Sequence, residues 1–170
     1  MSREKLIEMA LNNKKHSDAG TMEYVDSILE IPAANYYDPD IWQKEVDLIF
    51  KRTPLVLGVS KEIPNPGDYK SIDALGVPVL ISRDSKGDLN AYLNACRHRG
   101  AALVENGVGN KKRFGCPYHG WTYSEDGSLI GISSQEDFGD IDKTCKSLVR
   151  LPVLEKAGII WVILTPDSKV

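Results

Sequence analysis

The sequence predicts a mainly β fold, made of small antiparallel sheets and preceded by an N-terminal helical region. Three observations predict it. The chain has 170 residues, and a chain of this length buries roughly 70% of its unfolded surface, enough for one core without disulfides. Within residues 3–15 and 38–52 the apolar side chains recur at helical spacing. Beyond Pro54 they form short β-branched or alternating runs, separated by turn clusters such as Asn65-Pro-Gly-Asp68.

Two helices are expected before the β region. Residues 3–15 place Leu6, Ile7 and Leu11 at helical spacing among charged side chains. A second helix begins at Pro39 after the N-cap Asp38, and Pro54 prevents it from continuing. Its expected apolar face consists of Ile41, Trp42, Val46, Ile49 and Phe50. We therefore expect a helical extension over residues 1–52 and one compact domain over residues 53–170.

The expected strands are residues 54–60, 69–73, 77–82, 89–94, 113–115, 121–123, 129–132, 148–152 and 158–164. Residues 133–147 are acidic and contain glycine, which predicts a surface connection. Trp42 and Trp161 are expected to be core residues because large aromatic side chains bury much apolar area.

Composition and charge exclude several classes of protein. The chain carries 21 basic and 24 acidic residues, a net charge of -3, so it has no general attraction for nucleic acid or an anionic membrane. Its longest apolar run, Ala157–Leu164, is much shorter than the roughly 20 residues of a membrane span. The first residues lack the apolar core of a signal peptide, and three cysteines do not make a disulfide framework. We expect a cytoplasmic protein without nucleic-acid or membrane partners.

Two short segments each offer one cysteine and one histidine. They are Cys96-Arg-His98-Arg-Gly100 and Cys116-Pro-Tyr-His119-Gly-Trp121. Each follows an expected strand, so two thiolates and two imidazoles can converge at neighbouring loops. The C-x-H and C-x-x-H spacing, with 17 residues between His98 and Cys116, is that of a Rieske 2Fe-2S cluster. A structural zinc site accepts the same donors, but the large β region and the one-residue spacer favour iron–sulfur chemistry.

The segments Asn94-Ala-Cys96-Arg-His98-Arg-Gly100-Ala-Ala-Leu103 and Cys116-Pro-Tyr-His119-Gly-Trp121-Thr-Tyr123 resemble the signature of the Rieske non-haem iron oxygenases, the aromatic-ring-hydroxylating dioxygenase α subunits. The resemblance extends to Tyr37-Asp-Pro-Asp40, Ile63-Pro-Asn-Pro-Gly-Asp68 and Leu151–Val162. It implies a Rieske-type fold with cluster-binding hairpin loops. It also implies that Cys96 and Cys116 bind one iron of the cluster and that His98 and His119 bind the other.

The resemblance further implies an electron-transfer role within an oxygenase. Such enzymes also need a mononuclear Fe(II) site of two histidines and a carboxylate. The chain has three histidines, and with two assigned to the cluster only His16 remains. We therefore expect no oxygen-activating site and no catalytic residue in this chain, and expect that iron in a missing C-terminal domain.

The implied partners are a reductase or ferredoxin as electron donor, and the catalytic domain of the same or a neighbouring subunit, in a homo-oligomer that is trimeric in the family. A stand-alone Rieske ferredoxin is the alternative, although such carriers usually lack a helical extension. The respiratory Rieske proteins join their loops by a disulfide, whereas here the corresponding positions are Ala101 and Tyr118.

Several other residues receive weaker interpretations. Arg97, Arg99, Lys111, Lys112 and Arg113 form a positive group that either attracts an acidic electron donor or is simply solvated. Trp121 is expected to pack beside the cluster. Cys145 has no partner nearby in the sequence and is expected to be an unreactive thiol, and His16 is expected at a solvated helix end.

Overall fold

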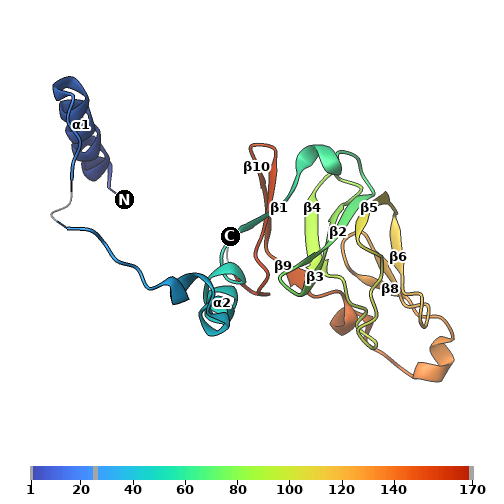
Figure 1. Cartoon of the computed structure of the whole chain (residues 1–170). Coiled ribbons are helices and arrows are strands. Elements are labelled where there is room, and N and C mark those ends of the chain that lie inside the picture. The colour runs from blue at the N-terminus through green and yellow to red at the C-terminus, as the bar shows by residue number, and fades with distance from the viewer. Residues whose placement is uncertain (1, 25–26, 169–170) are drawn as a thin grey trace. The chain divides into compact units, whose positions relative to one another are not determined.

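The computed structural model describes residues 2–24 and 27–168 (Figure 1). The chain forms two compact units, Met1–Asp38 and Pro39–Val170. The first unit holds the expected helix as α1, Arg3–Ala19, and a 3₁₀ turn, Ala33–Tyr36. Ser2 caps α1 by accepting a hydrogen bond from the Lys5 N–H. No residue of α1 is buried, and neither is any other residue before Pro39 that the structure describes.

The second unit begins with α2, Pro39–Glu45, which continues as a π-helical turn, Val46–Phe50. Only Val46 of this segment is buried. The prediction that Trp42 is a core residue is wrong, because 51% of its surface is exposed. The spacing predicts an apolar helix face but not whether other residues pack on it, and of this face only Val46 is buried in the core.

Three antiparallel sheets follow, in agreement with the mainly β prediction. Their strands are β1 Leu55–Val59, β2 Asp68–Ala74, β3 Val77–Arg83, β4 Leu89–Leu93, β5 Gly107–Asn110, β6 Arg113–Gly115, β7 Thr122–Ser124, β8 Leu129–Gly131, β9 Arg150–Leu151, β10 Val153–Lys156 and β11 Ile159–Val162. The orders are β1-β11-β10, β5-β2-β3-β4-β9 and β6-β7-β8.

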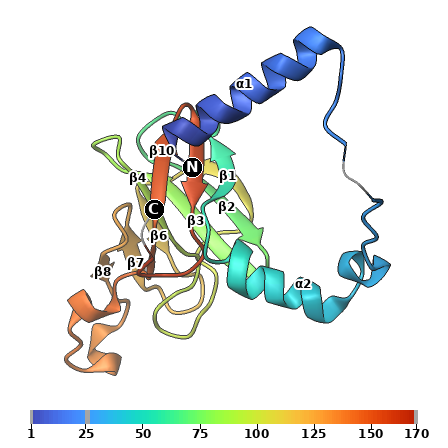
Figure 2. The same cartoon turned by 90° about the vertical axis from the view of Figure 1, so that its left-hand side faces the viewer.

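The five-stranded sheet separates two cores because its side chains alternate between its faces. Leu80 and Tyr92 pack with the residues of the β6-β7-β8 sheet. Val79 and Ile81 of the same sheet point the other way and pack with Ile160 of the β1-β11-β10 sheet. Figure 1 shows this arrangement, with β2, β3 and β4 between the two smaller sheets, and Figure 2 views the same strands from the side of β10. The central sheet therefore forms the rigid base for the loops that leave it.

Two strands differ from expectation for local reasons. Strand β5 has the sequence Gly-Val-Gly-Asn, and glycine weakens the strand pattern. Strand β10 follows Pro152 and carries Glu155 and Lys156, so it lacks an alternating apolar pattern. The expected surface connection over 133–147 contains two 3₁₀ turns, Gln135–Phe138 and Lys143–Lys146.

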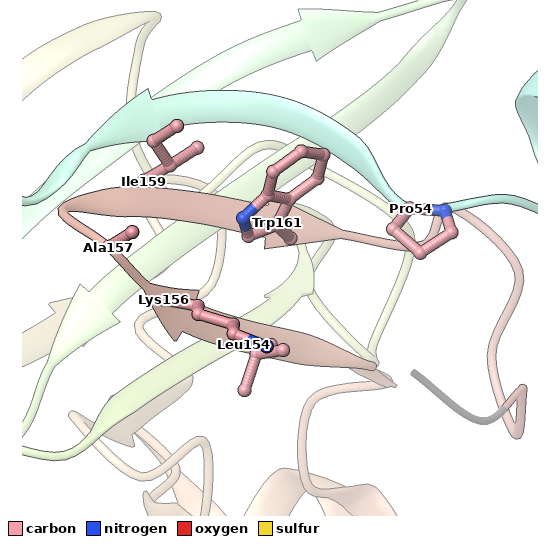
Figure 3. A pocket seen from close by; sticks show the side chains of 6 residues that line it. All are labelled: Pro54, Leu154, Lys156, Ala157, Ile159 and Trp161. Carbon is pink, nitrogen blue, oxygen red and sulfur yellow. The ribbon is translucent and has the colours of Figure 1, made fainter. Parts of the chain in front are cut away.

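The outer face of the β1-β11-β10 sheet is apolar. Ile159 and Trp161 project from β11 beside Leu154 and Lys156 of β10, and they line a shallow hollow of about 510 Å³ with Pro54 (Figure 3). Trp161 is therefore only partly buried and belongs to neither cluster of core residues, so its prediction as a core residue is wrong. The two-residue period of β11 explains this, because Ile160 and Val162 take the buried face.

Candidate functional site: two cysteine–histidine loops

The two predicted segments form loops with the same backbone closure. In the first, the Cys96 N–H donates to the Ala101 carbonyl at 2.8 Å, and the Gly100 N–H donates to the Cys96 carbonyl at 2.8 Å. In the second, the Cys116 N–H donates to the Trp121 carbonyl at 2.7 Å, with the corresponding glycine bond at 3.1 Å. Both glycines, Gly100 and Gly120, have positive φ, 77° and 64°. The two loops therefore share one backbone closure, although the histidine is the third residue of the first loop and the fourth residue of the second.

The two thiols lie together in the core. Cys96 and Cys116 are 3% and 5% exposed and share one cluster of buried side chains. Burial raises the pKa of the Cys96 thiol above its ordinary value, and neighbouring Cys116 adds to this rise, while the Tyr123 hydroxyl opposes it. A pair of buried thiols without a cation disfavours the thiolate form, so a metal is the natural charge partner for both.

The two imidazoles also form a pair. The ring centroids of His98 and His119 lie 4.6 Å apart in an edge-on arrangement. Both rings are half-buried, and the Nδ1 atom of each is buried without a hydrogen-bond partner. Burial lowers the pKa of His98, and the neighbouring His119 and Arg99 lower it further. Burying an unpaired polar atom costs about 1–3 kcal/mol, so each Nδ1 is suited to bind a metal.

Aromatic side chains enclose the imidazole pair. Trp121 is 2% exposed and stacks on His98 at 5.2 Å with an interplanar angle of 12°. Phe138 contacts the same ring edge-on at 5.2 Å. Tyr118 covers His119, with ring centroids 3.8 Å apart. The expected packing of Trp121 beside the site is thus present. No sequence pattern predicts the contact of Phe138, which reaches the site from the 3₁₀ turn Gln135–Phe138.

Tyr123 is a site residue that the motif spacing did not reveal. Its side chain is fully buried, and its hydroxyl lies 3.4 Å from the Cys96 Sγ. The same hydroxyl oxygen accepts a hydrogen bond from the Arg97 N–H at 2.9 Å. Burial and the neighbouring thiols raise the pKa of Tyr123, so it remains a neutral donor. The Tyr123 hydroxyl can therefore donate a hydrogen bond to a Cys96 thiolate.

The donors fit a 2Fe-2S cluster with mixed ligands. Such a cluster takes two thiolates on one iron and two imidazoles on the other, and the structure offers one sulfur pair and one imidazole pair. In the part of the chain that is described, no three Cys, His, Asp or Glu side chains surround a single ion position. The buried Nδ1 atoms have no competing partner. The residues present therefore fit this group.

Other residues considered at the sequence level lie outside the two loops. Cys145 is exposed, and its Sγ contacts the Asp142 carboxylate at 3.1 Å. His16 lies in the last turn of α1, where its Nδ1 is 3.0 Å from the Thr21 hydroxyl. The five basic residues of the predicted positive group are all exposed. Lys112 and Arg113 line a polar hollow of about 410 Å³ that also contains acidic residues. Only Arg97 and Arg99 belong to a cysteine–histidine loop.

The antiparallel scaffold and the paired donors together define the class of iron–sulfur domains with cysteine and histidine ligands. The family comparison agrees with this class. The model of the Rieske [2Fe-2S] domain matches residues 53–150, and the chain belongs to this family. Its cofactor is a Rieske 2Fe-2S cluster, and its role is electron transfer.

The relatives are subunits of oxygenases. The chain is 33% identical over 144 residues to the anthranilate 1,2-dioxygenase large subunit of Acinetobacter baylyi, covering 84% of this chain and 31% of the relative. Naphthalene 1,2-dioxygenase from Rhodococcus sp., a solved structure, superposes with a TM-score of 0.75 at 35% identity, covering 81% of this chain and 32% of that one. A quaternary ammonium Rieske monooxygenase gives a TM-score of 0.76 at 29% identity, covering 83% and 40%.

The chain spans less than a third of the length of the first of these relatives. The match therefore concerns the Rieske portion of an oxygenase subunit. None of the helices formed by residues 2–24 and 27–168 has the length and apolar character that crossing a membrane requires.

Proposed function

We propose that this chain is the electron-relay domain of a Rieske oxygenase α subunit, with Cys96, Cys116, His98 and His119 as the cluster ligands. The observation that carries the proposal is the pairing of two buried thiols with two imidazoles whose Nδ1 atoms are buried and unpartnered. We also propose residues 1–52 as a helical extension and 53–170 as the Rieske domain. The start of the family match at residue 53 supports that boundary.

Each ligand has a distinct physical role in this proposal. When bound, the cluster accepts and releases one electron, and its two imidazole ligands give a higher reduction potential than four thiolates do. The thiolates of Cys96 and Cys116 sit in the core, where water is excluded. The imidazoles of His98 and His119 bind through Nδ1 and keep part of each ring at the surface. The histidine side therefore forms the short route for an electron to leave.

The proposed partners follow from this geometry and from the relatives. The electron donor is a reductase or ferredoxin with an acidic surface, because the exposed Arg97 and Arg99 flank His98. The recipient is a mononuclear Fe(II) in a catalytic domain of the same or a neighbouring subunit of a homo-oligomer. A domain whose ligands are reduced thiols suits the cytoplasm, where thiols stay reduced.

Ligand substitution tests the proposal. The cysteines and histidines are changed singly, as Cys96→Ala, Cys116→Ala, His98→Ala and His119→Ala, with Cys145→Ala as the matched control. After reconstitution, iron, acid-labile sulfide and zinc are measured with the visible spectrum before and after dithionite. We expect about two irons and two sulfides per wild-type and control chain, and loss of the spectrum in the four ligand variants. A wild-type chain that binds only zinc, or variants that keep the full spectrum, would overturn the proposal.

A second experiment distinguishes an electron-relay domain of an oxygenase from a stand-alone ferredoxin. The loaded chain is reduced and mixed with the oxidised catalytic portion of an oxygenase from a relative, and with an electron-carrier acceptor such as cytochrome c. Electron delivery to the oxygenase portion supports the relay. Delivery to soluble carriers alone favours the ferredoxin function.

A further inference from the structure

Asn94 is a buried amide at the base of the first cysteine–histidine loop. It directly follows β4 and is 3% exposed. Its backbone N–H donates to the Pro78 carbonyl at 2.8 Å, which fixes it to the neighbouring strand. Cys96 is only two residues further along the chain. A displacement of the Asn94 backbone is therefore expected to move the Cys96 side chain as well.

The side chain of Asn94 closes the loop by pairing with its far end. The Oδ1 atom accepts hydrogen bonds from the Leu103 N–H at 3.0 Å and the Val104 N–H at 3.4 Å. The Nδ2 atom donates to the Val104 carbonyl at 2.7 Å. The amide thus pairs with Val104 as a strand residue would, and it brings the two ends of the 94–104 segment together.

The second N–H of the Asn94 side-chain amide also has a hydrogen-bond partner. Nδ2 donates to the Ser71 hydroxyl at 2.9 Å, and Ser71 lies on β2 in the central sheet. Both donors and both acceptor positions of Asn94 therefore have partners. A fully satisfied buried amide rigidifies the backbone around it. Leu103 and Val104 also belong to the same core as both candidate cysteine ligands.

We propose that Asn94 is a positioning residue that holds Cys96 and His98 in the orientation required to bind the cluster. This inference rests on the ligand assignment proposed above. Asn94 does not touch the cluster in this account. It acts through the loop backbone, by fixing both ends of the segment that carries the two ligands.

The matched control is Asn90, four residues earlier on β4. It is 7% exposed, and its side chain bonds the Asp84 carboxylate, the Asp88 carbonyl and Arg150. These partners lie outside the cysteine–histidine loops. Replacing either asparagine by alanine therefore removes a buried amide, on β4 for Asn90 and directly after β4 for Asn94, but only Asn94→Ala releases a ligand loop.

The test compares Asn94→Ala, Asn90→Ala and Ser71→Ala in the reconstituted protein. The readouts are the half-life of the visible cluster spectrum under a chelator and the electron paramagnetic resonance signal of the reduced cluster, measured beside the free energy of unfolding. Loss of a residue that orients a metal ligand typically weakens the site about 10- to 100-fold. We expect Asn94→Ala to shorten the half-life by about tenfold or more and to shift or broaden the signal. Asn90→Ala should leave both within about twofold.

Ser71→Ala keeps the pairing of Asn94 with Val104 and removes only one bond of the Asn94 side chain, together with the 3.4 Å bond from Ser71 to Asn106, so we expect an intermediate half-life. It also provides a readout if Asn94→Ala does not fold, and an unchanged half-life and signal in Ser71→Ala would then count against the proposal. Equal half-lives and signals in Asn94→Ala and Asn90→Ala would overturn it. A wild-type chain that never acquires the cluster would instead overturn the ligand assignment. Failure of the ligand assignment can therefore be distinguished from failure of the proposal for Asn94.

Discussion

Tyr123 shows how a single side chain can tune the site without being a ligand. Its hydroxyl oxygen accepts a hydrogen bond from the Arg97 backbone N–H, and the hydroxyl lies beside the Cys96 sulfur. A hydrogen bond to a cluster sulfur stabilises the reduced, more negative state more than the oxidised one. Tyr123 is therefore expected to raise the reduction potential.

Replacing Tyr123 by phenylalanine tests this role. The variant keeps the ring in the core but loses the bond to Cys96, so we expect the midpoint potential to fall by about 60 mV, equivalent to a tenfold change in the one-electron equilibrium. Potentiometric titration gives the value. Tyr92→Phe is the matched control, because Tyr92 is also fully buried and its hydroxyl contacts only the Glu125 carbonyl at 3.4 Å. Equal potentials in both variants would contradict the role.

The sequence made the four candidate ligands visible because they lie within two short segments of fixed spacing. The residues that contact or position these ligands cannot be recognised in the same way. Tyr123 and Phe138 reach the thiols and imidazoles only through the packing of the β6-β7-β8 sheet and the 133–147 connection. Asn94 stands in the motif, but its partner Ser71 lies 23 residues away. Tertiary contacts of this range leave no local pattern in the sequence.

The two ligand loops differ in how tightly their glycines are enclosed. Gly100 and Gly120 occupy corresponding positions with positive φ. A Cβ added at Gly100 meets no atom within 4 Å, whereas one at Gly120 collides with the side chain of Ser133. The second loop is therefore held against the 133–147 connection, and the first is open to solvent at this point.

This difference predicts unequal costs for the same substitution. Gly100→Ala carries only the penalty of the left-handed backbone, about 1–2 kcal/mol. Gly120→Ala adds the collision with Ser133 and displaces the loop that carries His119, so we expect a larger loss of unfolding free energy and a lower cluster content. Denaturant unfolding and iron analysis measure both. If Gly100→Ala were the more damaging of the two, the packing described here would be incorrect.

An ion pair connects the central sheet to β10. Arg83 of β3 donates to both carboxylate oxygens of Glu155, at 3.1 and 3.0 Å, and to the Ile63 carbonyl. The hydrogen bonds from Arg83 hold the pKa of the Glu155 carboxyl below its ordinary value. Because the folded state favours the ionised carboxyl, the ion pair stabilises the fold fully at a pH above the ordinary glutamate pKa of 4.5. This stabilisation is lost as the pH falls through the lower pKa that Glu155 has in the folded state.

Glu155→Gln should therefore destabilise the fold by about 1 kcal/mol at neutral pH, after allowance for its partial exposure. The difference from wild type should shrink as the pH falls below about 4.5. Urea unfolding at several pH values measures it. Glu136→Gln, in the exposed 3₁₀ turn Gln135–Phe138, is the charge-matched control. A constant difference across the pH range would show that the ion pair does not cause it.

Most strands were predictable where the side chains alternate or are β-branched, as in β2 and β3. Strand β3 is buried at five of its seven positions, and its sequence Val-Pro-Val-Leu-Ile-Ser-Arg already shows an apolar core. Strand β5 is not among the predicted strands because its two glycines leave no alternating apolar pattern. Its antiparallel pairing with β2 makes this segment a strand. The exposure of Trp42 was missed because spacing predicts a helix face but not whether anything covers it.

The division of the whole chain into two units predicts how it tolerates truncation. No described residue before Pro39 is buried, whereas Val46 is 6% exposed and the Thr165 hydroxyl bonds the Lys51 carbonyl. A variant lacking residues 1–38 should keep its cluster and its unfolding free energy within about 0.5 kcal/mol. A variant lacking residues 1–52 should lose more stability because it also loses Val46. Thermal and denaturant unfolding of the two variants distinguishes these outcomes.

The most direct test of the central claim is a Mössbauer spectrum of the chain loaded with ⁵⁷Fe, because it reports the ligands of each iron separately. Two thiolates on one iron and two imidazoles on the other predict two distinct iron sites in equal amounts, with the added electron localised on the imidazole-bound iron after reduction. Two equivalent irons, or a single mononuclear site, would contradict the assignment of Cys96, Cys116, His98 and His119.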